Sequence, residues 1–126
     1  MHLPSTSLHL IADIEGGRRL DDAVFVEAVL REAAAAARVT VVGMNLHHFG
    51  PGNGVTGVAV LAESHISIHT WPECGLVAVD IFVCGKTADA HAALAVMVER
   101  FGGRLALVRE VPRLGAAQPA DVAENR

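Results

Sequence analysis

The densest group of reactive side chains in this sequence is the run 63–73, which reads ESHISIHTWPE. Within it His65, Ser67 and His69 alternate with isoleucines, and residues two apart share one face of a β-strand. The pattern therefore predicts a strand with one apolar face and one face that is polar without being charged. Imidazole and hydroxyl groups gathered in this way suit acid–base or nucleophilic chemistry. The alternation alone is equally consistent with a solvent-exposed strand face whose histidines have no chemical role.

A metal site is one alternative, because the chain holds seven histidines. At about 3.3 Å per strand residue, His65 and His69 lie about 13 Å apart, which is too far to bind one ion together. The same spacing would work on a helix, but the β-branched alternation favours a strand. A metal site would need His47 or His48 to lie close to His65 or His69 and act as a second ligand. We expect no metal.

A Ser-His-Asp hydrolase is a second alternative. It would take its nucleophile from Ser64 or Ser67 and its carboxylate from Asp80. The nucleophile of such enzymes often lies on a sharp turn flanked by glycines, and the sequence AESHI around Ser64 contains none. Residues of these three types also occur together by chance, so the hydrolase interpretation is weak.

The elements that would position the run follow from hydrophobic periodicity and turn residues. Apolar residues three to four apart predict two helices, the first capped by Asp21 or Asp22 and the second by Thr87 or Asp89. Strands are expected at 8–14, 39–46, 55–62, 65–71, 76–84 and 104–111.

The resulting order, β-α-β-β-β-β-α-β, predicts an α+β fold. We expect a two-layer sandwich in which a mostly antiparallel sheet carries both helices on one face. The other sheet face would then lack a cover, which favours a homodimer or a higher homo-oligomer. The 126 residues fit a single domain, expected at 1–111. The small and polar segment 112–126 is expected to be a flexible tail.

Composition excludes several classes of function. The chain is 52% hydrophobic and carries a net charge of −4, which gives no basic face for nucleic acid. No apolar stretch approaches the roughly 20 residues of a membrane span, and the first residues do not resemble a secretory signal. We therefore expect a cytoplasmic protein, in which Cys74 and Cys84 are free thiols.

The segment 62–85, AESHISIHTWPECGLVAVDIFVCG, closely resembles the self-cleavage region of the prokaryotic S-adenosylmethionine decarboxylase proenzymes. Looser similarity extends from the first predicted strand through the second helix. The resemblance implies a self-processing, pyruvoyl-dependent enzyme that decarboxylates S-adenosylmethionine for spermidine biosynthesis. Its partners would be the small-molecule substrate and its own two cleavage chains, 1–63 and 64–126.

The resemblance also assigns roles in processing. Ser64 would attack the carbonyl of Glu63 and convert the amide to an ester, and elimination would leave a pyruvoyl group derived from Ser64. His69 matches the family's processing base, and an imidazole exchanges protons near neutral pH. Thr56 matches a position where the family usually has a serine that assists processing. The threonine keeps the hydroxyl and adds a methyl group.

In decarboxylation, the resemblance implies that the pyruvoyl carbonyl forms a Schiff base with the substrate amine and accepts the electrons left by carbon dioxide. Cys84 matches the proton donor to the resulting carbanion. Glu73 matches a glutamate that binds the ribose hydroxyls, and Phe49 matches an aromatic residue that stacks on adenine. The family's active sites lie at a dimer interface, which agrees with an uncovered sheet face.

Two departures from the family pattern keep other functions open. Cys74 and Leu76 stand where these enzymes commonly carry tyrosines, beside the predicted ribose ligand. A sister enzyme that decarboxylates arginine or ornithine on the same scaffold would keep the processing residues without the nucleoside contacts. A non-catalytic homologue is the other alternative, although it would have no chemical reason to keep Ser64, His69 and Cys84.

Overall fold

The structure, a computed structural model, describes residues 7–113. Its elements follow the predicted order. They are β1 (Leu8–Glu15), α1 (Ala23–Ala36), β2 (Val41–His48), β3 (Val55–Leu61), β4 (Ser64–Trp71), β5 (Leu76–Val83), α2 (Ala90–Phe101) and β6 (Arg104–Pro112).

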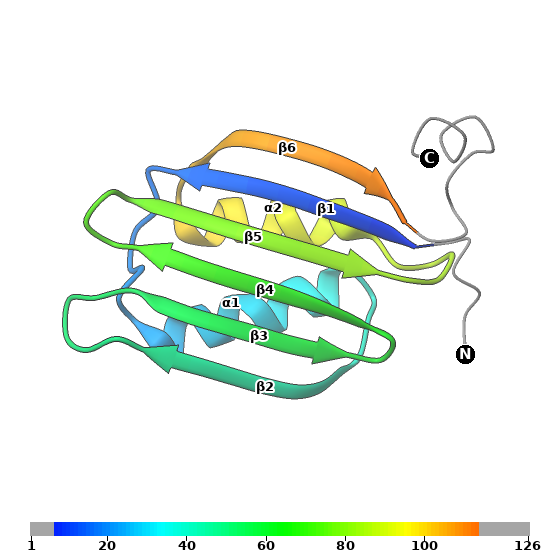
Figure 1. The fold of residues 1–126 in the computed structure, drawn as a ribbon, viewed down its shortest axis with the longest axis horizontal. Coiled ribbons are helices and arrows are strands. Elements are labelled where there is room, and N and C mark those ends of the chain that lie inside the picture. Colours follow the sequence, from blue (N-terminus) through cyan, green and yellow to red (C-terminus); the bar gives the residue numbers. More distant parts are fainter. Residues whose placement is uncertain (1–6, 114–126) are drawn as a thin grey trace, which may run out of the picture.

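The six strands form one sheet in the order β2-β3-β4-β5-β1-β6, and every neighbouring pair is antiparallel. Both helices lie on the same side of this sheet (Figure 1). The predicted α+β two-layer sandwich is therefore confirmed. Among residues 7–113, neither helix is long and apolar enough to cross a bilayer.

The helix caps resolve the two alternatives that the sequence left open. Asp22 caps α1 by accepting a hydrogen bond from Phe25 N at 3.0 Å, and Asp89 caps α2 by accepting one from Ala92 N at 3.0 Å. The Phe25 N–H also holds the pKa of Asp22 below its ordinary value. Helix α2 ends at Gly102, whose φ of 73° is one that glycine adopts without steric cost.

The predicted strand boundaries shift by one or two residues. Strand β2 begins at Val41, two residues later than expected, because Val39 N still donates to the carbonyl of Ala34 at the end of α1. At the other end of the chain, β6 includes Pro112, which pairs with Leu8. Most of the predicted tail at 112–126 lies outside the described residues.

The core lies between the sheet and the helices. The isoleucines of β4, Ile66 and Ile68, are fully buried in it, while His65 and Ser67 are half-buried and His69 is exposed. This burial pattern confirms the alternation that the sequence predicts for the strand. The polar side chains consequently lie on the sheet face opposite the helices.

We call this second face the open face. Its central strands present His9, Ile11, Asp13, His65, Ser67, His69, Trp71, Ala78, Asp80 and Phe82. No described helix or strand covers it (Figure 1). Trp71 is 44% exposed and Leu76 39% exposed on this face, so it leaves large apolar groups in contact with water.

Candidate active site

The turn between β3 and β4 holds the peptide at which cleavage is predicted. Leu61 pairs with Ser64, so only Ala62 and Glu63 connect the two strands. Glu63 has a φ of 65°, in the left-handed region that residues with a Cβ rarely adopt. Such a conformation costs about 1–2 kcal/mol. The carbonyl predicted to be attacked therefore belongs to a strained residue.

The predicted nucleophile and the predicted proton donor lie side by side. Ser64 is the first residue of β4, and Cys84 directly follows the neighbouring strand β5. The backbone N–H of Cys84 donates to Ser64 Oγ at 3.2 Å. This contact also explains why the strand ends at Val83, one residue earlier than expected. The pairing of β4 with β5 thus brings together two residues that are twenty positions apart in the sequence.

A third side chain joins this pair. Ser7 Oγ lies 3.2 Å from Cys84 Sγ, and Ser7 is only 3% exposed. Nothing in the local sequence around Ser7 predicts this contact. It depends on the pairing of β1 with β5, in which Leu8 lies opposite Val83.

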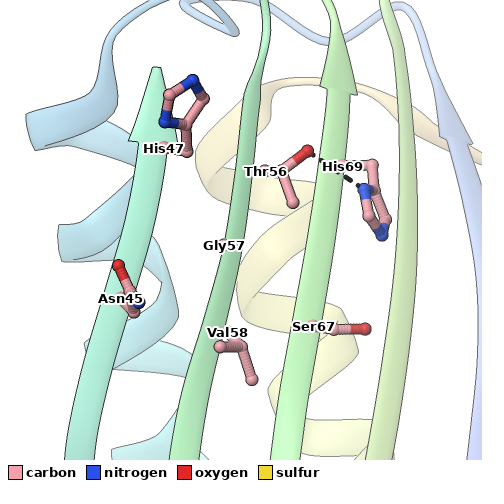
Figure 2. A pocket seen from close by; sticks show the side chains of 7 residues that line it. All are labelled: Asn45, His47, Thr56, Gly57, Val58, Ser67 and His69. Atoms are coloured by element: carbon pink, nitrogen blue, oxygen red, sulfur yellow. Dashed lines mark hydrogen bonds between the residues drawn. The ribbon is translucent and has the colours of Figure 1, made fainter. Parts of the chain in front are cut away.

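The predicted processing base and its helper also meet. Thr56 on β3 pairs with His69 on β4, and Thr56 Oγ1 lies 3.2 Å from His69 Nδ1. Figure 2 shows this contact at the edge of a hollow of about 290 Å³. The hollow is lined by Asn45, His47, Thr56, Gly57, Val58, Ser67 and His69.

The two predicted substrate-binding residues line an adjoining hollow of about 360 Å³. Phe49 and Glu73 share it with Thr56, His69 and Trp71. Phe49 is 57% exposed, and its ring makes an edge contact with the His47 ring at a centroid distance of 4.5 Å. The structure thus gathers four predicted site residues from three separate segments at one end of the open face.

Thr70 contacts the base of the loop that carries Phe49. The Thr70 hydroxyl is buried, donates to the carbonyl of Leu20 at 2.6 Å and accepts from Val55 N at 2.8 Å. A Cβ on Gly54 would lie 2.0 Å from the carbonyl oxygen of Thr70, so only glycine allows this close approach. The approach fixes the start of β3 and, with it, the base of the loop.

The two groups of predicted residues lie at opposite ends of β4. Ser64 begins the strand and His69 lies five residues further along it, which corresponds to about 16 Å. Within one chain, His69 therefore does not reach Ser64. The prediction that His69 removes a proton from Ser64 requires a second copy of the chain.

A polar network occupies the centre of the open face, and it joins the predicted Ser67 and Asp80 to His9 and Arg113, which the sequence did not single out. Asp80 accepts from His9 Nε2 at 2.6 Å and from Ser67 Oγ at 3.3 Å. Arg113 Nη1 lies 2.8 Å from His9 Nδ1. Because a guanidinium can only donate, Nδ1 accepts and Nε2 carries the imidazole proton. In the sequence, His9 alternates with the apolar residues of β1 that form the core, and this alternation alone predicts that His9 lies on the open face.

This network argues against the hydrolase alternative. Ser67 donates to the Asp80 carboxylate instead of to a histidine, so it lacks the serine–histidine hydrogen bond of a Ser-His-Asp triad. Ser64 Oγ accepts from a backbone N–H and has no histidine partner either. As for metal, residues 7–113 contain no cluster of three or more side chains able to ligate an ion.

Comparisons with known proteins point to one family. The family model for S-adenosylmethionine decarboxylase matches residues 8–114. The S-adenosylmethionine decarboxylase proenzyme of Thermomicrobium roseum is 40% identical over 111 residues, which cover 88% of this chain and 96% of that protein. The proenzyme of Pseudomonas aeruginosa is 44% identical over 96 residues, which cover 76% of this chain but only 59% of that protein.

A solved structure extends the agreement to the fold. The crystal structure of the adenosylmethionine decarboxylase from Aquifex aeolicus superposes with a TM-score of 0.77 at 33% identity, covering 86% of this chain and 90% of that one. The family model spans both ends of β4 and every predicted site residue. This chain belongs to the S-adenosylmethionine decarboxylase family.

Proposed function

We propose that this chain is a self-processing S-adenosylmethionine decarboxylase that cuts its backbone between Glu63 and Ser64 and makes a pyruvoyl group from Ser64. The observation that carries the proposal is the left-handed Glu63 directly before a serine whose hydroxyl oxygen is held by Cys84 N–H. Membership of the family supports the same conclusion.

The cut begins when Ser64 Oγ attacks the carbonyl carbon of Glu63. The peptide C–N bond breaks, the amide becomes an ester, and the nitrogen remains on Ser64 as an amine. The hydrogen bond from Cys84 N–H limits the motion of Oγ before the attack. The left-handed conformation of Glu63 favours the step, because its steric cost is released when the peptide opens.

Elimination completes the cut. A base removes the α-proton of Ser64, and Glu63 leaves with the ester oxygen as the free carboxylate of chain 1–63. The dehydroalanine left at residue 64 takes up water and releases ammonia, which yields the pyruvoyl group. His69 is our candidate base, and the Thr56 hydroxyl beside its Nδ1 would hold the ring in orientation.

A second copy of the chain could supply a His69 close to Ser64, which the His69 of the same chain does not reach. If two open faces stack with their β4 strands antiparallel, His69 of the partner subunit comes opposite the end of β4 at which Ser64 lies. The exposed Trp71 and Leu76 side chains would be buried in the same contact. We therefore propose a homodimer in which each active site takes its nucleophile from one chain and its base from the other.

Substrate binding would use the partner's hollow in the same way. The Glu73 carboxylate can accept hydrogen bonds from two neighbouring ribose hydroxyls, and the exposed Phe49 ring can stack on adenine. Both residues would then lie across the interface from Ser64. The hollow contains no guanidinium or ammonium group, which agrees with a substrate whose sulfonium carries a positive charge.

The pyruvoyl group, once formed, supplies the electron sink for loss of carbon dioxide from the substrate. The residues that remain must then hold the substrate and return a proton to its α-carbon. Cys84 lies directly beside residue 64 and carries a thiol proton suited to this step. The product would serve as the aminopropyl donor for spermidine synthesis.

Arginine or ornithine decarboxylation is less well supported. The relatives named above carry the name of the S-adenosylmethionine enzyme. Glu73 and Phe49 could contact a nucleoside, and neither arginine nor ornithine contains one. Release of carbon dioxide from the three substrates, measured side by side, tests this choice. Release from arginine or ornithine alone would overturn it.

Self-processing is tested by intact mass under denaturing conditions. We expect two fragments that divide between Glu63 and Ser64, the second without a normal amino terminus. The variant Ser64→Ala is the matched control and should stay uncut. A wild-type chain that also stays uncut on long incubation would favour the non-catalytic homologue.

A further inference from the structure

We propose that Ser7 is a positioning residue for Cys84, and that its hydroxyl donates to the sulfur so that the thiol proton is aimed at the substrate. The proposal rests on the function proposed above and adds a residue that neither the sequence pattern nor the family resemblance assigns. It starts from the contact of 3.2 Å between Ser7 Oγ and Cys84 Sγ.

The contact is built into the fold. Leu8 pairs with Val83, so the residues next to them, Ser7 and Cys84, face each other at the ends of β1 and β5. Ser7 is 3% exposed. A buried hydroxyl that loses its hydrogen bond costs free energy, and this one is satisfied by a sulfur atom.

Cys84 needs such a partner because it lies beyond the last residue of β5. Its backbone is held by the bond from its N–H to Ser64 Oγ, but a cysteine side chain can occupy three staggered rotamers. The hydrogen bond to Ser7 selects one of them. Cleavage removes Ser64 Oγ and leaves the Ser7 contact in place.

Processing also places the two residues on different chains. Ser7 belongs to the fragment 1–63 and Cys84 to the fragment 64–126. The contact is therefore a direct link between the fragment 1–63 and the proton donor that lies beside the reactive end of the fragment 64–126. A hydroxyl that donates to sulfur also stabilises the thiolate left after proton transfer.

The predicted consequence concerns where the proton goes. The pyruvoyl group made from Ser64 would supply an electron sink, so a proton could return either to the substrate α-carbon or to the carbon derived from Ser64. A proton on the α-carbon gives the amine product. A proton on the other carbon leaves the substrate nitrogen on the chain as an amino-terminal alanine, while the rest leaves as an aldehyde whose oxygen comes from water. Each such error destroys one active site.

The first test follows these errors directly. In Ser7→Ala we expect the yield of amino-terminal alanine per turnover, read by Edman degradation of the 64–126 chain, to rise about two- to tenfold, the range of one hydrogen bond. Ser7→Thr keeps the hydroxyl and should stay near wild type. Thr87→Ala, an exposed hydroxyl on the loop before α2, is the matched control. An unchanged yield of alanine in Ser7→Ala overturns the proposal.

The second test does not depend on decarboxylation. In a Ser64→Ala, Cys74→Ser background the protein is uncut and Cys84 is its one thiol. Adding Ser7→Ala should slow alkylation of Cys84 by iodoacetamide at neutral pH about two- to tenfold, because the thiolate is the reacting form. A rate that stays the same or rises overturns the proposal, provided that the melting temperature shows a folded protein.

The two proposals fail in different ways. If wild type and Ser7→Ala both remain uncut, the proposed function is wrong. If both are cut and both decarboxylate S-adenosylmethionine with the same yield of alanine, self-processing stands and only the role of Ser7 is lost.

Discussion

The two ends of β4 are built by different means. At the start of β4 the backbone sets most of the geometry, through the left-handed Glu63 and the N–H of Cys84, and the one added side chain is the buried Ser7. At the end of β4, side chains set it, since Phe49 and His69 line an open hollow.

The difference indicates a division of labour. The end at Ser64 places the serine hydroxyl next to the backbone, as a reaction between adjacent backbone atoms requires. The end at His69 is open and lined by side chains, as recognition of a small molecule requires. In the proposed homodimer neither end is complete in one chain, because about 16 Å of strand separates them.

The largest expected effect is the loss of cleavage when a chain lacks Ser64 or His69, and its recovery when two chains each supply one of these residues. His69→Ala should stay uncut alone, because it lacks the base, and Ser64→Ala should stay uncut because it lacks the nucleophile. When the two variants are co-expressed with distinguishable tags, we expect cleavage of the His69→Ala chain by the partner's His69. Intact mass of the tagged fragments measures this rescue.

Two results would contradict the proposal that Ser64 and His69 act together from different chains. Cleavage of His69→Ala alone at the wild-type rate would remove His69 as the base. Absence of cleavage in the mixed protein, with mixed dimers demonstrated by pull-down of one tag through the other, would remove the shared site.

A second prediction concerns the strain at the Ser64 end. Glu63→Gly should adopt the left-handed φ without steric cost, so the relief that accompanies cleavage is lost and processing should slow about tenfold, the equivalent of about 1.4 kcal/mol. Glu63→Gln keeps the Cβ and removes only the charge, and it should process close to the wild-type rate. Quench-flow samples resolved by mass measure both rates. Equal rates for Glu63→Gly and wild type would show that the strain plays no part.

Much of the fold could be predicted from local sequence. The alternation of Ile66 and Ile68 with polar residues correctly predicts the two faces of β4, and Asp22 and Asp89 are aspartates at predicted helix caps. These features depend on residues close together in the chain. The separation of Ser64 from His69 also follows from the rise per strand residue, the same rise that argues against a shared metal site in this strand.

The rest depends on contacts between distant segments. Ser7 meets Cys84 only because β1 pairs with β5, and no local pattern specifies that pairing. The left-handed φ of Glu63 has no sequence signal either, since glutamate is not a residue that favours it. The roles of Ser64, His69 and Cys84 come from the family resemblance, and they remain predictions until the variants are measured.

A third prediction sharpens the contrast at the His69 end. Glu73→Gln removes the charge that would hold the ribose hydroxyls, and a hydrogen bond to a charged group contributes about 1.5–3 kcal/mol. We expect KM for S-adenosylmethionine to rise about tenfold or more while the extent of self-cleavage stays unchanged. Glu99→Gln, on α2 at the opposite face, is the control. A fall in cleavage with no change in KM would move Glu73 from binding to processing.

The smallest effect is expected at Thr56, which combines a hydroxyl with an added methyl group. Thr56→Val keeps the shape and loses the contact with His69 Nδ1, so processing should slow by about two- to tenfold, the range of one hydrogen bond. Thr56→Ser restores the residue common in the family and should process at least as fast as wild type. The two variants separate the hydroxyl from the methyl group, because each changes one of them. If Thr56→Val processes at the wild-type rate, His69 is oriented by other contacts, and the hydroxyl beside it is only a polar residue on the strand.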